Sequence, residues 1–194
     1  KLIYYIEEFY GNDIKNNDEY ARIINERHFN RLSSLMDNDK VVYGGDSDID
    51  DLYISPTIMN NITWDDPIME DEIFGPILPI LEYESIVEVI ENIKMRPRPL
   101  ALYVFSTNSK VVDKIINSLS FGGGCVNDTI MHLTNPHMPF GGVGNSGIGA
   151  YHGKYSFDTF THYKSISNKS LSPDIDTRYP PYKGKLKWVR KLLK

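Results

Sequence analysis

The chain has 194 residues, of which 41% are hydrophobic and 24% are charged, a composition typical of folded globular proteins that excludes a disordered or fibrous chain. The formal net charge of -5 excludes a molecule whose whole surface binds nucleic acid. The single cysteine, Cys125, excludes an internal disulfide framework, and no apolar run reaches the roughly 18–20 residues that cross a bilayer.

The N-terminal part of the chain shows two periodic segments and three short apolar runs. They predict helices over residues 2–10 and 18–36, and strands over residues 40–43, 53–59 and 77–81. In the longer helical segment, apolar residues gather toward one face. The chain begins with Lys1 rather than Met, and no N-cap residue precedes its first helical segment. We therefore expect a piece cut from a longer polypeptide.

From Ser85 on, helices and strands alternate. Ser85-x-x-Glu88 is a capping box, in which the serine and glutamate side chains bond free amides at a helix start. The predicted elements that follow are a helix ending before Pro97, a strand over 100–105, a helix over 111–119 and a short strand ending at Asn127. This order predicts a parallel sheet with right-handed crossovers, hence an α/β domain. Ligand sites of such sheets gather at the carboxyl ends of the strands, where Asn127 and Asp128 stand.

The C-terminal part is richer in glycine, proline and basic residues. Residues 141–149 form a glycine-rich loop, 157–166 predict a strand, and 167–181 predict an extended arm. Residues 183–194 hold six Lys or Arg that alternate with apolar residues, which predicts a basic amphipathic helix. Such a tail has two interpretations: weak contact with an anionic membrane surface, or docking on the protein itself.

A glycine pattern, Gly142-x-Gly144-x-x-Gly147, matches the dinucleotide-binding expression. No β-branched run precedes it, and no acidic residue follows about 20 positions on, so its context does not fit that role. Its glycines predict a tight turn or a close approach of the backbone to a neighbouring segment.

An acidic pattern, Asp46-x-Asp48-x-Asp50, imitates the start of a calcium loop. The sixth position is Asp51 rather than glycine, and the twelfth is Thr57 rather than glutamate. We expect a solvated acidic turn here instead of a metal site.

Cys125 is a candidate nucleophile, with His132 and His137 near it in the sequence. A lone cysteine on a short apolar strand is more often a small buried side chain, which is the interpretation we favour. Activation would require a base or a cation against the thiol. The histidines, with His152 and His162 included, lack the spacing of zinc ligands, so no metal site is expected.

Three segments resemble the aldehyde dehydrogenases. Glu72-Ile73-Phe74-Gly75-Pro76 resembles the E-x-F-G-P signature of that superfamily, and residues 139–149 resemble its P-F-G-G-x-x-x-S-G-x-G segment. Residues 151–162 and Arg178-Tyr179-Pro180-Pro181 are typical of the class 3 enzymes, which act on fatty and aromatic aldehydes. The resemblance runs from Leu2 to about Tyr182 without a large gap.

The resemblance implies the α/β catalytic domain of these enzymes, a mostly parallel sheet with flanking helices and a C-terminal oligomerisation arm. The expected divisions are a catalytic portion over 1–162, an arm over 163–182 and a basic tail over 183–194. The enzymes oxidise aldehydes to carboxylates with NAD or NADP through a cysteine thiohemiacetal, and a glutamate base hydrolyses the thioester. In the family pattern this cysteine, this glutamate and the main coenzyme domain lie upstream, so the chain alone is expected to be inactive.

The resemblance also assigns supporting roles to residues of this chain. Glu72 matches the carboxylate that hydrogen-bonds the nicotinamide ribose, and Phe74 matches the aromatic ring packed beside the nicotinamide. Further positions match the wall of the aldehyde channel: Ile130, Leu133, Thr134, Phe140 and His152. An apolar wall suits a medium-chain, long-chain or aromatic aldehyde. Ordinary core packing is the alternative role for each of these channel residues.

Two interpretations of function remain open at this point. The first is part of a cytoplasmic, homodimeric aldehyde dehydrogenase that contacts no nucleic acid and whose tail is either free or peripheral to a membrane. The second is a non-catalytic dimerisation or binding module derived from the same family. A CoA-acylating relative is a weaker enzymatic alternative, because the class 3 segments are so well matched.

Overall fold

The computed structural model describes residues 1–192, so Leu193 and Lys194 of the basic tail lie outside the described residues. The chain forms two compact units. The first unit contains Lys1–Arg96 and Asn108–Leu119, and the second contains Pro97–Thr107 and Ser120–Lys194.

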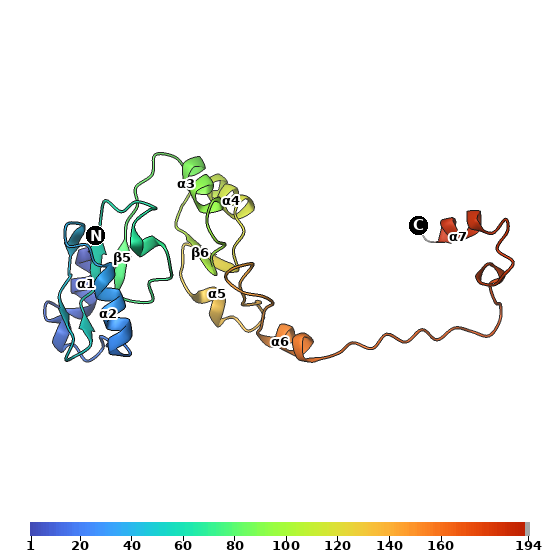
Figure 1. Ribbon diagram of the computed structural model, residues 1–194, viewed down its shortest axis with the longest axis horizontal. Helices are drawn as coiled ribbons and strands as arrows, with labels where there is room; N and C mark the ends of the chain where they lie inside the picture. Colours follow the sequence, from blue (N-terminus) through green and yellow to red (C-terminus); the bar gives the residue numbers. More distant parts are fainter. Residues whose placement is uncertain (193–194) are drawn as a thin grey trace. The chain divides into compact units, whose positions relative to one another are not determined.

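The first unit is built from helices packed with short strands (Figure 1). Its first elements in chain order are α1 (Leu2–Tyr10), η1 (Ile14–Asn16), α2 (Glu26–Leu35), β1 (Val41–Tyr43), β2 (Ser47–Asp48), β3 (Tyr53–Ile54) and β4 (Thr57–Met59). They are followed by η2 (Pro67–Met69), β5 (Ile77–Pro79), α3 (Ile86–Lys94) and α4 (Ser109–Ser118). The sequence predicted most of these elements. The strands in the structure are shorter than the predicted ones.

The predicted helix over 18–36 is wrong in its first half, because α2 begins only at Glu26. Asn25 is its N-cap, and the Asn25 side chain accepts a hydrogen bond from the His28 amide. Before the cap, the Ile23 amide donates to the carbonyl of Leu52 at 2.9 Å. This bond to a distant segment takes the backbone out of the helical path that local spacing favours.

Two small sheets hold the first unit together. β4 is the central strand of one sheet, antiparallel to β1 and parallel to β5, with Thr57 opposite Ile77. β2 and β3 form an antiparallel pair. The core cluster of the first unit consists of Phe29, Leu32, Ile54, Met59, Ile62, Ile68 and Ile77.

The capping box at α3 is confirmed. Ser85 accepts the Glu88 amide at 3.2 Å, and the Glu88 carboxylate accepts the amide of Glu84 at 3.1 Å. α3 packs against α4, whose N-cap Asn108 accepts the Lys110 amide. Local sequence therefore determines where both helices begin.

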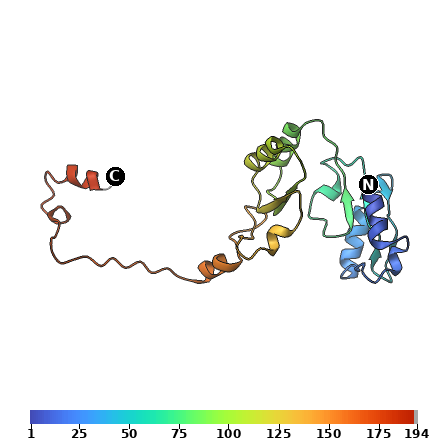
Figure 2. The ribbon, with the colours of Figure 1, turned by 180° about the vertical axis from the view of Figure 1, so that it is seen from behind.

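The second unit contains a parallel pair of strands, β6 (Ala101–Val104) and β7 (Gly123–Val126), with Leu102 opposite Gly124. α5 (Met131–Thr134) packs against β7, and both views show it beside the strand pair (Figures 1 and 2). The parallel pairs in both units agree with the predicted α/β class, whereas the antiparallel pairs of the first unit are not foreseen by the sequence pattern.

The predicted strand over 157–166 is wrong. Residues Gly153–Phe160 form the helix α6, and residues 161–175 have no regular helix or strand. The aromatic and β-branched residues here favour a strand. Local bonds nevertheless hold the helix, since Lys154 pairs with Asp158 one turn on and the Thr159 hydroxyl donates to the Tyr155 carbonyl.

The C-terminal residues form η3 (Asp176–Arg178) and α7 (Leu186–Leu192). The predicted amphipathic helix is therefore present over part of the basic tail, and its Leu186 and Trp188 side chains are exposed. Among residues 1–192, no helix is long and apolar enough to span a bilayer.

Candidate functional site

In the first unit, the segment Glu72–Pro76 is held on both sides of Phe74. The Arg31 guanidinium donates to the Ile73 carbonyl at 2.6 Å. On the other side, a Cβ added at Gly75 would lie 2.5 Å from the Leu32 side chain, which is completely buried. A side chain at this position would displace Leu32, so glycine lets the backbone pass close to the core.

Phe74 adopts a strained backbone and is exposed. Its φ is 47°, in the left-handed region that non-glycine residues rarely enter. Its side chain is 80% exposed, so the strain is not offset by burial of the ring. A conformation of this kind persists only where its surroundings impose it, and such residues cluster at ligand sites.

The Glu72 side chain is exposed. Among residues 1–192 no lysine or arginine forms an ion pair with it, and no hydrogen bond to its carboxylate is found. Two free carboxylate oxygens beside a rigid aromatic residue suit a ligand that offers two neighbouring hydroxyl donors. The first unit thus places Glu72 and Phe74 on one short, pinned segment.

In the second unit, Asn127 holds the carboxyl ends of β6 and β7 together. Its side chain accepts the Ser106 amide at 2.8 Å and donates to the Ser106 carbonyl at 3.1 Å. Asp128 accepts the amide of Thr129 at 2.7 Å. The sequence predicted a ligand site at these strand ends. In the structure the Asn127 amide joins the two strand ends, and the Asp128 carboxylate bonds the backbone of its own loop.

Rings gather around Phe140 in the second unit. The Phe140 ring lies 5.8 Å from His132, 5.5 Å from Tyr151 and 6.1 Å from His152, centroid to centroid. Backbone bonds in both directions link Phe140 to Tyr151. The structure thus brings together two of the predicted channel residues, Phe140 and His152, and adds His132 and Tyr151, which the sequence did not assign to the channel.

The other three predicted channel residues lie at or near α5. Ile130 precedes the helix with a φ of 64° and an exposed side chain. Leu133 is half-buried, and Thr134 is exposed, with its hydroxyl bonded to the Met131 carbonyl at 3.0 Å. Ile130 and Leu133 supply apolar surface, whereas the Thr134 hydroxyl is already engaged with the helix.

The Cys125 thiol is half-buried rather than buried, and it faces a histidine. Its sulfur lies 3.6 Å from Nδ1 of His132, which is 5% exposed. The other ring nitrogen of His132 has no hydrogen-bond partner among the described residues. The sequence places His132 near Cys125, but it does not show that the two side chains meet, because the contact joins a strand to a helix across an intervening loop.

The predicted tight turn of the glycine loop is confirmed. A Cβ at Gly142 would lie 2.2 Å from the Ser146 carbonyl oxygen, and Gly144 has a φ of 66°. Ser146 closes the turn by accepting the amide of Val143 at 3.0 Å. The glycines serve the close approach of two backbone segments.

In the acidic loop Asp46 and Asp50 are exposed, in agreement with the predicted solvated turn, and Asp48 forms an ion pair with Lys15. This pair lowers the pKa of the Asp48 carboxyl and raises that of the Lys15 ammonium. Among residues 1–192, no group of three or more His, Cys, Asp or Glu is arranged to hold a metal ion.

Comparisons with known proteins agree on one family. The model of the "Aldehyde dehydrogenase family" matches residues 2–166. The chain is 52% identical over 191 residues to a 4,4'-diaponeurosporen-aldehyde dehydrogenase of Staphylococcus aureus, and 50% identical over 188 residues to a dimeric NADP-preferring aldehyde dehydrogenase of Rattus norvegicus. These matches cover 97% and 96% of the chain, but only 42% of each relative.

A solved structure gives the same result. The substrate-bound state of Staphylococcus aureus AldH matches with a TM-score of 0.91 and 52% identity, over 100% of this chain and 43% of that one. The sequence and the fold therefore point to the same group of proteins, of whose length this chain spans about two fifths.

Proposed function

The chain belongs to the aldehyde dehydrogenase family, and we propose that it forms part of an enzyme that oxidises medium-chain, long-chain or aromatic aldehydes to carboxylates. The pinned and strained Phe74, with Glu72 beside it, is the observation that carries the proposal. A strained, exposed aromatic residue on a rigid segment is expected where a ligand packs against it.

The residues present fit a nicotinamide coenzyme. Glu72 would accept hydrogen bonds from the ribose hydroxyls, and Phe74 would orient the nicotinamide by packing on it. When bound, NAD or NADP supplies the acceptor for the aldehyde's hydride. This chain contributes positioning: Arg31 and Leu32 hold the segment in place, so that Glu72 and Phe74 need little reorganisation on binding.

The ring cluster around Phe140 would form part of the aldehyde channel. Phe140, His152 and Ile130 provide aromatic and apolar surface in the second unit, which suits substrates whose binding comes mainly from apolar burial. The proposed reaction takes its nucleophile from the upstream cysteine that the family resemblance implies, and assigns no catalytic role to Cys125.

The direct test joins this chain to the remaining part of the Staphylococcus aureus relative, outside its matched 191 residues. We expect the chimera to reduce NAD or NADP with hexanal or benzaldehyde, and the 194-residue chain alone to show no turnover. Activity of the chain alone that disappears in Cys125→Ser would overturn the assignment. A folded but inactive chimera would favour the non-catalytic module.

The role of Glu72 is tested in the same chimera. Glu72→Gln removes a charge-assisted acceptor, which costs about 1.5–3 kcal/mol, or roughly 10- to 150-fold in the coenzyme-dependent step. Glu70→Gln is the matched control, because Glu70 is also exposed and lies two residues earlier. Equal kinetics of the two variants would contradict the ribose-binding role.

We also propose a homodimer in which residues 163–182 act as the oligomerisation arm. Exposed apolar side chains support this, since Ile166 and Leu171 lie in the extended part of that segment. Light scattering of the chain and of a version ending at His162 tests it: we expect only the longer form to associate.

The cytoplasm is the proposed location, and the basic tail is the proposed point of any membrane contact. α7 exposes Leu186 and Trp188 beside several basic side chains, a pattern that suits an anionic surface. Co-sedimentation with anionic vesicles at low salt, compared with a version ending at Tyr182, tests this role. Equal binding of both versions would assign the tail to the protein surface.

A further inference from the structure

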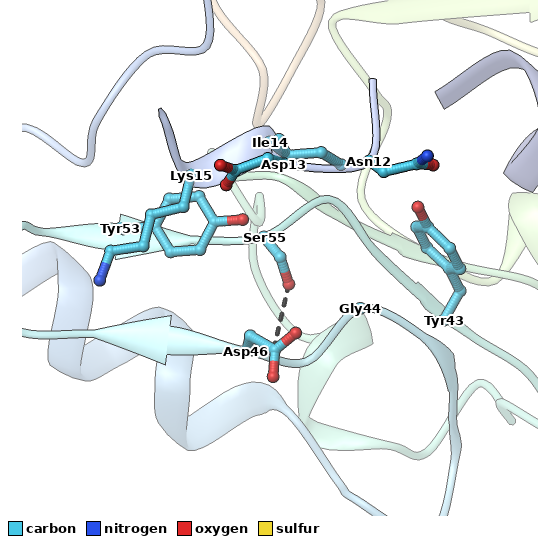
Figure 3. A pocket seen from close by; sticks show the side chains of 9 residues that line it. All are labelled: Asn12, Asp13, Ile14, Lys15, Tyr43, Gly44, Asp46, Tyr53 and Ser55. Carbon is cyan, nitrogen blue, oxygen red and sulfur yellow. Dashed lines mark hydrogen bonds between the residues drawn. The ribbon is translucent and has the colours of Figure 1, made fainter. Parts of the chain in front are cut away.

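Two buried imidazole nitrogens of the second unit lack a hydrogen-bond partner among residues 1–192, namely Nε2 of His132 and Nδ1 of His152. The cavity of about 390 Å³ in the first unit (Figure 3) has no such atom in its lining, and the Arg22 guanidinium carbon lies 5.1 Å from the centre of the Tyr53 ring there. A buried polar atom without a partner calls for an explanation, such as a reactive role or a bound molecule.

The two imidazoles flank Phe140. The Phe140 ring lies 5.8 Å from the His132 ring and 6.1 Å from the His152 ring, on which it stacks. Tyr103 of β6 adds a fourth ring, 5.8 Å from His132. These rings belong to the surface proposed above for the aldehyde channel. A ligand with an apolar body and one hydrogen-bonding end, such as an aldehyde, suits such a cluster.

His132 also faces the Cys125 thiol. Cys125 and Gly123 lie on one face of β7, because alternate residues of a strand point the same way. Nδ1 of His132 lies 3.6 Å from the Cys125 sulfur, and a Cβ at Gly123 would lie 2.9 Å from Cδ2 of the same imidazole. Glycine therefore lets the imidazole rest against the strand with Nδ1 at the sulfur.

A thiol beside a fixed imidazole has the arrangement of an activated nucleophile. The thiolate is the reactive form, and a free thiol is only a few per cent ionised at neutral pH. His132, which is 5% exposed, offers Nδ1 as the acceptor of the thiol proton. Cys125 itself is only half-buried, so a small molecule can reach the sulfur.

We propose that Cys125 captures α,β-unsaturated aldehydes covalently, an inference that rests on the proposed aldehyde-oxidising function. The sulfur forms a bond with the β-carbon of the aldehyde, and the π electrons of the C=C bond move to the α-carbon. The thiol proton passes through Nδ1 of His132 to that α-carbon. The net step adds S–H across the double bond, so nothing is oxidised or reduced and no group leaves.

The test uses the 194-residue chain, in which Cys125 is the single cysteine, with cinnamaldehyde as the probe. Mass spectrometry after borohydride trapping follows the adduct, and peptide sequencing locates it. We expect Cys125 to react about 10-fold faster in the folded chain than in the urea-unfolded chain, because only folding holds His132 at the sulfur. Hydrocinnamaldehyde, which lacks the double bond, should leave Cys125 unmodified. An equal or slower reaction of the folded chain would overturn the proposal, and this comparison depends on no variant.

His132→Gln removes the proton acceptor and should slow the reaction of the folded chain about 10-fold. His137→Gln is the matched control, because His137 is exposed and lies close to His132 in the sequence, and it should leave the rate unchanged. Circular dichroism checks that both variants remain folded. Equal rates of the two variants would overturn the role of His132 as the proton acceptor.

Iodoacetamide, a polar reagent without a ring, tests the aldehyde class. Folding should accelerate its reaction with Cys125 less than that of cinnamaldehyde, because the ring cluster favours an aromatic body. Equal acceleration of both reagents would overturn the proposed ligand class.

The adduct and the proposed enzyme activity are measured separately, since the adduct forms on the chain without coenzyme. A chimera that oxidises hexanal, together with a chain that forms no adduct, would overturn the capture site alone. An adduct at Cys125 together with a folded but inactive chimera would support the capture site and contradict only the proposed function.

Discussion

The two units of the chain differ in how their apolar residues are used. All the buried hydrophobic residues of the described chain except Val104 lie in the first unit, and seven of them form one core cluster that contains the completely buried Leu32. The second unit leaves large side chains such as Phe160 and Leu171 exposed. Its order comes instead from β6 paired with β7, the Asn127 clamp and the rings around Phe140.

This difference separates a unit with a buried apolar core of its own from a unit whose proposed roles are binding and association. Apolar burial is the dominant favourable contribution to folding, and the first unit supplies its own. The second unit carries most of the residues proposed for the aldehyde channel and the oligomerisation arm. Surfaces that serve binding remain uncovered until their partners are present.

The largest expected effect is the loss of the first unit's core. Leu32→Ala should destabilise that unit by about 2–5 kcal/mol, because it removes a fully buried side chain and leaves a cavity. Urea unfolding followed by Trp64 fluorescence in a Trp188→Phe background reports on this unit alone. Leu171→Ala, at a residue that is 97% exposed, should change stability by less than about 0.5 kcal/mol. Equal losses in both variants would break the comparison.

A smaller effect is expected from the strand pair of the second unit. Gly124→Ala would place a Cβ 2.0 Å from the Leu102 carbonyl oxygen, and the resulting displacement should cost about 1–3 kcal/mol. Hydrogen exchange of the β7 amides should accelerate, while the Trp64-reported transition of the first unit stays unchanged. Cys125→Ala is the neighbouring control. A shift of the Trp64 transition would show that the two units unfold together.

The strained backbone at Phe74, a proposed coenzyme-binding residue, should lower the stability of the first unit. Phe74→Gly removes the left-handed strain and should stabilise the first unit by up to about 1 kcal/mol relative to Phe74→Ala, which keeps the strain. Both variants remove the ring and should weaken coenzyme binding in the chimera. Unfolding midpoints that rank alanine above glycine would contradict the strain argument.

The smallest effect concerns pH. A hydrogen bond from Lys40, then one from the Thr63 amide, lowers the pKa of Asp66 below its ordinary value of 3.8. A lowered folded-state pKa stabilises the protein above the unfolded-state value and loses that contribution as pH falls through the folded-state pKa. The first unit should therefore weaken below about pH 4, and Asp66→Asn should flatten this dependence of the Trp64 midpoint. If the Trp64 midpoint of Asp66→Asn depends on pH as steeply as that of the unchanged protein, the Lys40–Asp66 pair is not a source of the pH dependence.

Local signals in the sequence determined several features correctly. The capping box over Ser85 and Glu88, the tight turn at Gly142 and the existence of β6 and β7 follow from residues a few positions apart. The motif Glu72–Pro76, together with the segments 139–149 and 151–162, predicted the family. The start of α2 at Glu26 was not predicted, because a backbone bond to a distant segment outweighed the local spacing. The helix α6 was not predicted, because its aromatic and β-branched residues favour a strand although the Lys154–Asp158 pair is local.

Only the tertiary structure decided how the functional residues are presented. The left-handed Phe74 depends on Arg31 and Leu32, about forty residues earlier in the chain, and the Cys125 contact with His132 depends on a strand meeting a helix. Capping and turn preferences act over a few residues, whereas exposure, strain and pairing arise from packing between segments that sequence spacing does not encode.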